Sequence, residues 1–225
     1  MKTKATCLLV LISFILSAQK LAEGFTYLKK ENPTLILDLR YATSENFTGK
    51  IVTGYTSEKA IGTKALSIAL RKVQAQLRPK GLGLKVFDAY RPQSAVDAFV
   101  SWATSVPDTL KKREYYPNLK KEDLFELGYI AEKSGHTRGS TIDVTLVYLK
   151  GRRKGKEIDM GGKWDYFGEA SHFNYQKISP KQMENRRLLR DLMIQGGFNP
   201  YEKEWWHFSL KNEPFPTTYF DFPLP

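Results

Sequence analysis

The sequence predicts a single α+β domain, and three observations support this fold class. First, 225 residues match the ~100–200 residues of one ordinary domain. Second, a composition of 41% hydrophobic and 26% charged residues is typical of globular chains and excludes disordered, collagen-like and coiled-coil proteins. Third, segments with strand-like and helix-like periodicity alternate along the chain, with neither an internal repeat nor a clear linker between them.

The individual elements follow from hydrophobic periodicity. Alternating or continuous apolar runs predict strands at residues 33–41, 82–87, 141–148 and 204–210. Apolar positions at helical spacing predict helices at residues 58–79, 94–104 and 180–195, the last closed by Gly196 and Gly197. Residues 107–121 are polar and contain prolines, which predicts a long surface loop. The tail 214–225, rich in proline and aromatic residues, is expected to pack over the surface in extended form.

The first 18 residues are typical of a secretory signal peptide. Lys2 and Lys4 precede an apolar run over residues 7–16, and Ala18 supplies a small residue at its end. The run is shorter than the ~20 residues that a membrane-spanning helix needs. A buried core strand or helix is the alternative. We expect residues 1–18 to be removed and residues 19–225 to form an exported, periplasmic domain without a stable membrane anchor.

Charge and cysteine content exclude two further classes. The only cysteine, Cys7, lies in the leader, so a disulfide framework is excluded. The net charge is +11, and the densest basic stretch is residues 150–156. Zinc-finger spacing, a recognition-helix pattern and an aromatic-basic repeat are all absent from the sequence, so we expect no nucleic-acid partner. The basic stretch, with two glycines, predicts a solvated hairpin tip.

Two of the three histidines have acidic neighbours in the sequence. His136 precedes Asp143 by seven residues, and His207 follows Glu204 by three. Imidazole and carboxylate groups are good zinc ligands, and a catalytic site takes three of them plus a water. Alone, each histidine is better explained as a hydrogen-bonded core residue, whereas His136 and His207 together with Asp143 and Glu204 favour a metal site. His172 lacks such neighbours, and we expect it not to be a ligand.

The spacing of these residues requires two irregularities. Residues seven apart on an ideal strand face opposite sides, so His136 and Asp143 can share a metal only if a turn intervenes. Gly139 can provide that turn because glycine tolerates positive φ. Glu204 and His207, three residues apart, would also face opposite sides. We therefore expect Glu204 at an irregular strand start, from which it reaches round to the metal-bound water.

Arg91 follows the predicted strand 82–87 and can point into a cleft. A permanently charged guanidinium suits a carboxylate or a developing oxyanion. A salt bridge to Asp88 is an equally good interpretation of this segment alone.

Three motifs together resemble one known family. They are Ser134-Gly-His136 with Asp143, Glu204-Trp-Trp-His207, and Asp88-Ala-Tyr-Arg91-Pro. They are similar to those of the VanX-type D-alanyl-D-alanine dipeptidases, which are zinc D,D-peptidases with a hedgehog-like fold, and further collinear segments extend the likeness over roughly residues 33–223. The resemblance implies a central, mostly antiparallel sheet with flanking helices and a zinc site at the sheet.

The resemblance also implies a role for each site residue. One zinc ion is held by His136, Asp143 and His207, while Glu204 is the catalytic base and Arg91 stabilises the transition state. Asp165 is the carboxylate that binds the amino end of the substrate. The implied reaction is hydrolysis of D-alanyl-D-alanine to two D-alanines. The predicted leader favours a part in cell-wall peptide turnover over the cytoplasmic resistance role of some family members.

Two alternatives remain at this point. A D,D-carboxypeptidase or endopeptidase acting on larger peptidoglycan peptides would use the same zinc site in a more open cleft. We expect the loop 107–121 to wall the site and so favour a dipeptidase. A non-catalytic zinc-containing wall-binding module would be expected to lack the base or the arginine, whereas Glu204 and Arg91 are both present.

Overall fold

The computed structural model describes residues 21–104 and 109–224. The predicted signal peptide, residues 1–18, lies outside the described residues. Within the described ranges, no helix combines the length and apolar character needed to cross a bilayer.

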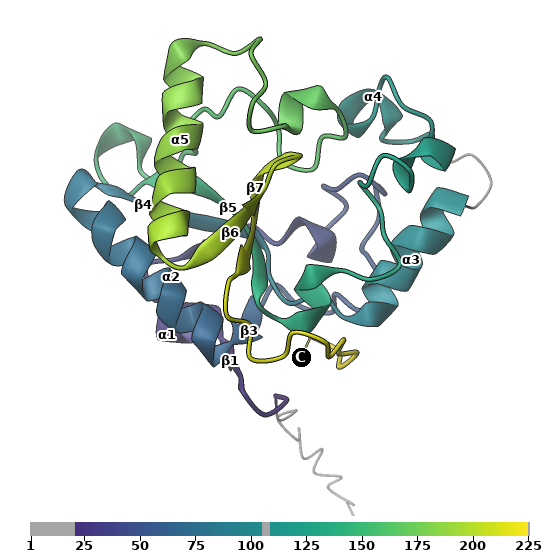
Figure 1. Ribbon diagram of the computed structural model, residues 1–225, viewed down its shortest axis with the longest axis horizontal. Coiled ribbons are helices and arrows are strands. Elements are labelled where there is room, and N and C mark those ends of the chain that lie inside the picture. Colours follow the sequence, from purple (N-terminus) through teal and green to yellow (C-terminus); the bar gives the residue numbers. More distant parts are fainter. Residues whose placement is uncertain (1–20, 105–108, 225) are drawn as a thin grey trace, which may run out of the picture.

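A five-stranded sheet runs through the centre of the molecule (Figure 1). Its strands, in spatial order, are β2 (Ile36–Leu37), β4 (Leu82–Asp88), β5 (Thr141–Tyr148), β7 (Glu204–Leu210) and β6 (Phe198–Tyr201). Only the β2–β4 pair is parallel, so the mostly antiparallel sheet is confirmed. A second, two-stranded antiparallel sheet joins β1 (Phe25–Tyr27) to β3 (Ile61–Thr63).

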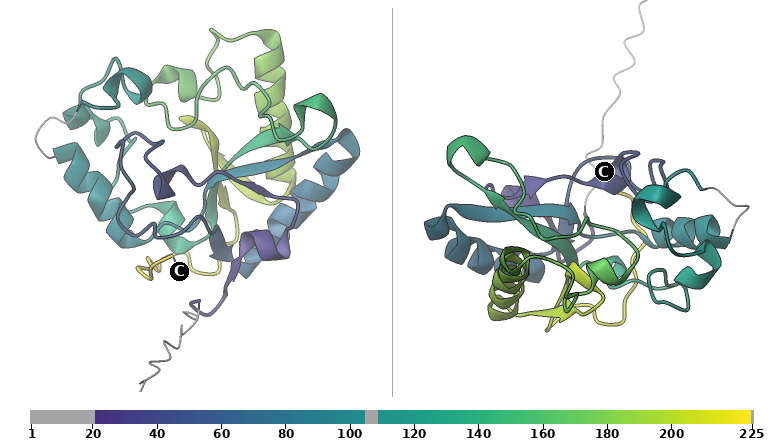
Figure 2. Two further views of the ribbon diagram at one scale, coloured as in Figure 1. Left: turned by 180° about the vertical axis from the view of Figure 1, so that it is seen from behind. Right: turned by 90° about the horizontal axis from the view of Figure 1, so that it is seen from above.

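Two long helices cover one face of the central sheet (Figures 1 and 2). Helix α2 (Lys64–Leu77) packs on β4 and helix α5 (Pro180–Gln195) packs on β6 and β7. Thr63 caps α2 by accepting a hydrogen bond from the Leu66 amide. Ser179 and Gln182 form a capping box at the start of α5, which satisfies backbone N–H groups that the helix leaves unpaired.

The remaining helices are short or lie to the side of the sheet. Helix α3 (Gln93–Thr104) follows β4. Helices α1 (Leu28–Glu31) and α4 (Lys112–Tyr115) are single turns. Short 3₁₀ turns occupy Arg40–Ala42, Arg78–Lys80, Lys121–Leu124, Gly135–Arg138, Gly151–Arg153 and Glu169–Ser171.

Arg186 holds the irregular segment 160–172 against helix α5. Its side chain is buried and donates hydrogen bonds to the carbonyls of Met160, His172 and Ala170, at 2.6, 2.7 and 2.8 Å. These carbonyls lie at the two ends of the segment, so one guanidinium closes it into a loop. Burial lowers the pKa of Arg186 to about 10, which leaves it charged at neutral pH.

The C-terminal tail is extended and packs on the small sheet, as predicted. The Phe222 ring stacks on Tyr90 and meets Phe25 edge to face. The Asp221 carboxylate accepts a hydrogen bond from the Ser94 amide at 2.8 Å and thereby caps the start of α3.

The structure confirms most of the predicted elements and corrects three. Strand 141–148, helix 180–195 and strand 204–210 have the predicted bounds, and strand 82–87 and helix 94–104 differ by one residue. Gly155 and Lys156 bond back to Tyr148, so the basic stretch is a hairpin tip as expected.

The corrections concern segments in which local pairing outweighs periodicity. Predicted strand 33–41 is sheet only at Ile36–Leu37, since the chain then turns through Arg40–Ala42. Predicted helix 58–79 begins at Lys64, because residues 61–63 pair with β1. The predicted loop 107–121 contains α4. Strands β1, β3 and β6 were not predicted, and each has only three or four residues.

Candidate active site

Sheet register brings the predicted metal ligands together. Asp143 on β5 pairs directly with His207 on β7, and on its other side with Asp88 on β4. A bulge between Val86 and Asp88 changes the register of β4 at that point. Three side chains that are far apart in sequence are thus neighbours across three adjacent strands.

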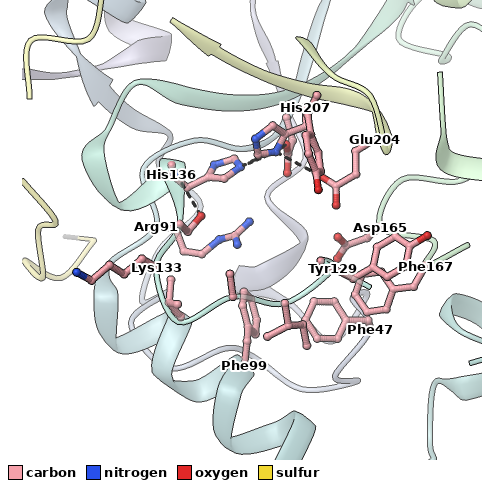
Figure 3. A pocket seen from close by; sticks show the side chains of 18 of the residues that line it. Phe47, Arg91, Phe99, Tyr129, Lys133, His136, Asp165, Phe167, Glu204 and His207 are labelled. Atoms are coloured by element: carbon pink, nitrogen blue, oxygen red, sulfur yellow. Dashed lines mark hydrogen bonds and ion pairs between the residues drawn. The ribbon is translucent and has the colours of Figure 1, made fainter. Parts of the chain in front are cut away.

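The third predicted ligand reaches the cluster through the expected turn. His136 lies in the 3₁₀ turn Gly135–Arg138, which ends at Gly139 with φ 75°. A side chain at Gly139 would also overlap the Phe25 ring. The glycine therefore reverses the chain between His136 and Asp143, which allows both side chains to face the same point (Figure 3).

The three ligand atoms have the spacing of a tetrahedral metal site. His136 Nε2 lies 3.3 Å from Asp143 Oδ1 and 3.4 Å from His207 Nδ1, and His207 Nδ1 lies 3.1 Å from Asp143 Oδ1. Ligands about 2.0–2.1 Å from a tetrahedral zinc lie about 3.3 Å from one another. His136, Asp143 and His207 therefore fit a metal ion without rearrangement. Within the described ranges, they are the one group of histidine, cysteine, aspartate or glutamate side chains whose ligand atoms lie close enough together to hold a metal ion.

Neighbouring groups prepare these ligands for a metal. The Nδ1 atom of His136 lies 2.7 Å from the Ala89 carbonyl, so it carries the proton and Nε2 is free to bind a metal. Asp143 Oδ1 is buried and has no hydrogen-bond donor, which is the state of an oxygen that awaits a cation. Burial disfavours its charge, but His136 and His207 hold the pKa of Asp143 well below its usual range.

Glu204 stands beside the cluster, at the first residue of β7. The β6–β7 register shifts between Pro200 and Tyr201, next to the Tyr201–Glu204 pair. This irregularity is the one that the sequence required, and Glu204 Oε2 lies 3.3 Å from His207 Nδ1. Burial, with a contribution from the Asp143 carboxylate, raises the pKa of Glu204 to about 7.

Arg91 both enters the pocket and pairs with Asp88. Its Nη2 and Nε atoms lie 2.8 and 3.0 Å from Asp88 Oδ2, and the Tyr55 hydroxyl donates to Asp88 Oδ1 at 2.6 Å. The guanidinium lies 5.1 Å from each of the Tyr41 and Phe99 rings. Burial opposes its charge, but Asp88 more than offsets this, so the pKa of Arg91 lies well above its ordinary value. The two sequence interpretations of Arg91 are therefore compatible.

Asp165 lies across the pocket from His136 (Figure 3). It is buried, and its Oδ2 accepts a hydrogen bond from the Tyr41 hydroxyl at 2.8 Å. Among the described residues, Asp165 is the one residue other than glycine that has a positive φ, at 63°. Strained backbone conformations of this kind are common at functional sites. Burial raises the pKa of Asp165 well above its ordinary value, which disfavours the ionised carboxylate. A cation bound beside Asp165 would form an ion pair with the carboxylate and so favour its ionised form.

These side chains line one cavity of about 180 Å³. This volume is below the roughly 300–1,000 Å³ of pockets for drug-sized ligands, so the cavity suits a small molecule. One wall is residues 128–136, and aromatic rings, among them Phe47, close the base.

The predicted wall formed by residues 107–121 is not found. The described part of that segment, residues 109–121, contributes no lining residue to the cavity. It lies one layer behind instead, where the Tyr115 carbonyl accepts a hydrogen bond from the Phe167 amide at 2.7 Å. Since Phe167 does line the cavity, the segment supports the wall without forming it.

His172 lies outside the cluster, as expected. Its Nε2 atom lies 3.3 Å from the Tyr129 hydroxyl, and it does not belong to the group of metal-ligand atoms.

Sequence reasoning missed several residues that shape the site. Tyr41 and Tyr55 hold two functional carboxylates, and Tyr129 and Phe167 form part of the wall. An isolated tyrosine or phenylalanine has no spacing signal, and each could equally be a core residue. Only the fold shows which acid or cavity they meet.

Three side chains placed to bind one metal ion, with a carboxylate and an arginine in the same small cavity, form the arrangement expected of a metallopeptidase. The comparisons with known proteins agree. Residues 22–225 match the model of peptidase family M15, described as D-Ala-D-Ala dipeptidase. The chain belongs to this family.

Three relatives, each named D-alanyl-D-alanine dipeptidase, match most of the chain. The protein of Enterococcus faecalis is 45% identical over 199 residues, which cover 88% of this chain and 97% of the relative. That of Enterococcus faecium is 42% identical over 201 residues, covering 89% and 98%. That of Streptomyces coelicolor is 44% identical over 187 residues, covering 83% and 91%. The family resemblance seen in the sequence motifs is confirmed.

Proposed function

We propose that this chain hydrolyses D-alanyl-D-alanine to two D-alanines, with one zinc ion held by His136, Asp143 and His207. The observation that carries the proposal is the triangle of ligand atoms, with sides of 3.1–3.4 Å, on the wall of a small cavity. When bound, zinc polarises a carbonyl oxygen and lowers the pKa of a water molecule towards ~7.

Glu204 is suited to move the proton of the attacking water. Its carboxylate is beside the ligand cluster, and burial raises its pKa, which favours a group that accepts a proton and releases it again. It accepts the proton during attack on the peptide carbonyl and passes it to the amine of the leaving D-alanine.

Arg91 is suited to stabilise the oxyanion that forms on the carbonyl oxygen. Asp88 and the two rings hold its guanidinium in place before the reaction, so little reorganisation is needed when negative charge develops. Its presence in the cavity with Glu204 argues against a non-catalytic wall-binding module.

Asp165 is suited to bind the free ammonium group of a dipeptide. It is buried at the end of the cavity, where a carboxylate needs a cationic partner. A D,D-carboxypeptidase substrate continues at this point and offers no ammonium. This difference, together with the small volume of the cavity, favours the dipeptidase over the carboxypeptidase and endopeptidase alternatives.

The predicted leader supports a proposal for the site of action in the cell. A basic start and an apolar run of ten residues support export to the periplasm, where the enzyme would recover D-alanine from cell-wall peptides. Fractionation of cells for the protein, with determination of its mature N-terminus, tests this part of the proposal.

The decisive assay measures D-alanine released from D-alanyl-D-alanine by the purified protein. We expect release that is lost after treatment with a chelator and restored by one equivalent of zinc per chain. Preference for the tripeptide D-Ala-D-Ala-D-Ala would support a carboxypeptidase instead. Zinc binding without release from either peptide would support a binding module.

A further inference from the structure

A second cavity adjoins the active site and is separated from it by two aromatic rings. This cavity has a volume of about 470 Å³, and the residues that line both cavities are Tyr129 and Phe167. Their rings stack with centroids 5.2 Å apart and planes inclined by 27°. We call this pair the ring wall.

The ring wall stands at the end of the active site where Asp165 lies (Figure 3). Phe167 is two residues beyond Asp165, Tyr129 stacks on Phe167, and all three residues line the active-site cavity. If Asp165 holds the ammonium group of the dipeptide, the next residue of a longer peptide would have to pass where these rings stand.

Several contacts hold the ring wall closed. The Tyr129 hydroxyl lies 3.3 Å from His172 Nε2, and the Tyr129 amide donates to the Leu124 carbonyl at 2.9 Å. The preceding turn is held by Lys203, whose Nζ donates to the Leu127 carbonyl at 2.7 Å. Stacked rings with fixed backbones resist displacement better than a single flexible side chain.

The second cavity, behind the ring wall, is large enough to hold a further residue of a longer substrate. It contains both polar and aromatic side chains, among them His172, Tyr175 and Lys203, and it is more than twice the volume of the active-site cavity. Space for another residue therefore exists, and the ring wall denies access to it.

We infer that Tyr129, stacked on Phe167, is a second determinant of substrate length beside Asp165, because it blocks N-terminal extension of the substrate into the second cavity. The inference rests on the proposed function and identifies a part of the site that sets substrate length. It assigns Tyr129 a specificity role through exclusion, a steric form of discrimination against a longer competitor.

The test compares Tyr129→Ala with wild type on D-Ala-D-Ala and on Gly-D-Ala-D-Ala. Cleavage of the tripeptide at its last bond gives Gly-D-Ala and D-alanine, which chromatography separates. We expect the ratio of tripeptide to dipeptide kcat/KM to rise by at least about tenfold, the lower end of what one steric feature in an apolar pocket is worth.

Three further variants make the result specific. Tyr129→Leu removes the ring but keeps an apolar side chain, so it decides the question if the alanine variant does not fold. Tyr129→Phe retains the ring and is expected to retain the low ratio. Tyr175→Ala removes a similarly half-buried tyrosine that lines only the second cavity, and it should leave the ratio unchanged.

The outcomes separate this inference from the proposed function. If wild type fails to cleave D-Ala-D-Ala, the proposed function is wrong. If wild type cleaves it but neither Tyr129→Ala nor Tyr129→Leu raises the ratio, only the role of the ring wall is wrong. An equal rise in Tyr175→Ala would show that general loosening of the second cavity is responsible, and would also overturn the inference.

Discussion

The two sides of the active site are built differently. Most of the metal side stands on adjacent strands, where register fixes Asp143 beside His207 and beside Asp88, and His136 joins it from the tight turn before β5. The substrate side stands on irregular segments, with Asp165 in strained backbone and Tyr129 in the turn-rich segment that follows Leu124. The difference suggests that chemistry is fixed by the sheet and substrate choice by the loops. Changes on the metal side should then reduce cleavage of every substrate alike, whereas changes on the substrate side should alter the choice between substrates.

The largest effect is expected from removing a metal ligand. His136→Ala should abolish stoichiometric zinc, measured by metal analysis, and with it all D-alanine release. His172→Ala is the matched control and should keep both, because His172 contacts Tyr129 and not the cluster. Loss of zinc from the His172 variant would show that the ligand assignment is wrong.

Loss of the base should be nearly as severe, but without loss of metal. Glu204→Gln retains the shape of the side chain and removes its ability to accept a proton. We expect kcat to fall by about 10²–10⁴-fold, the usual contribution of a general acid–base group, with little change in KM. A variant that lost its zinc as well would instead place Glu204 among the metal ligands.

Replacing Arg91 tests whether its guanidinium stabilises the transition state. Arg91→Ala should lower kcat by about 10²–10³-fold, as for loss of one oxyanion donor. Since this change also leaves the buried Asp88 unpaired, Arg91→Lys serves as the control that keeps the charge. An increase confined to KM would make Arg91 a clamp for the ground-state carboxylate.

The substrate side should respond in selectivity. Wild type should cleave N-acetyl-D-Ala-D-Ala negligibly, because the acetylated amine leaves buried Asp165 without a cation. Asp165→Asn should reduce kcat/KM for D-Ala-D-Ala by about tenfold or more, since a hydrogen bond to a charged group is worth about 1.5–3 kcal/mol. It should also narrow the gap between the two substrates. Equal cleavage of both by wild type would favour the carboxypeptidase alternative.

The same contrast explains what the sequence could predict. Long elements with a clear period, such as 141–148 and 180–195, were predicted to the residue. The three residues predicted as metal ligands are also the ones whose ligand atoms the structure brings together. The need for a turn at Gly139 and an irregular start at Glu204 also followed from spacing alone.

The remainder depends on contacts that periodicity does not encode. Strand 33–41 looked continuous, but the chain leaves the sheet after Leu37 and brings Tyr41 to Asp165. The wall was expected from residues 107–121 because that loop was long and polar, whereas the cavity is lined by residues 128–136. Which loop closes a cavity is decided by tertiary packing, for which loop length is a poor guide.

The three hydrogen bonds of Arg186 have a consequence for how the substrate side moves. Because they tie both ends of segment 160–172 to helix α5, this irregular segment should open together with the helix rather than fray alone. Its hydrogen-bonded amides, such as that of Phe167, should then exchange with deuterium at rates close to those of α5. Arg186→Met should make the amides of segment 160–172 exchange faster than those of α5. Asp165 would then lie on a segment that opens to solvent independently of the helix.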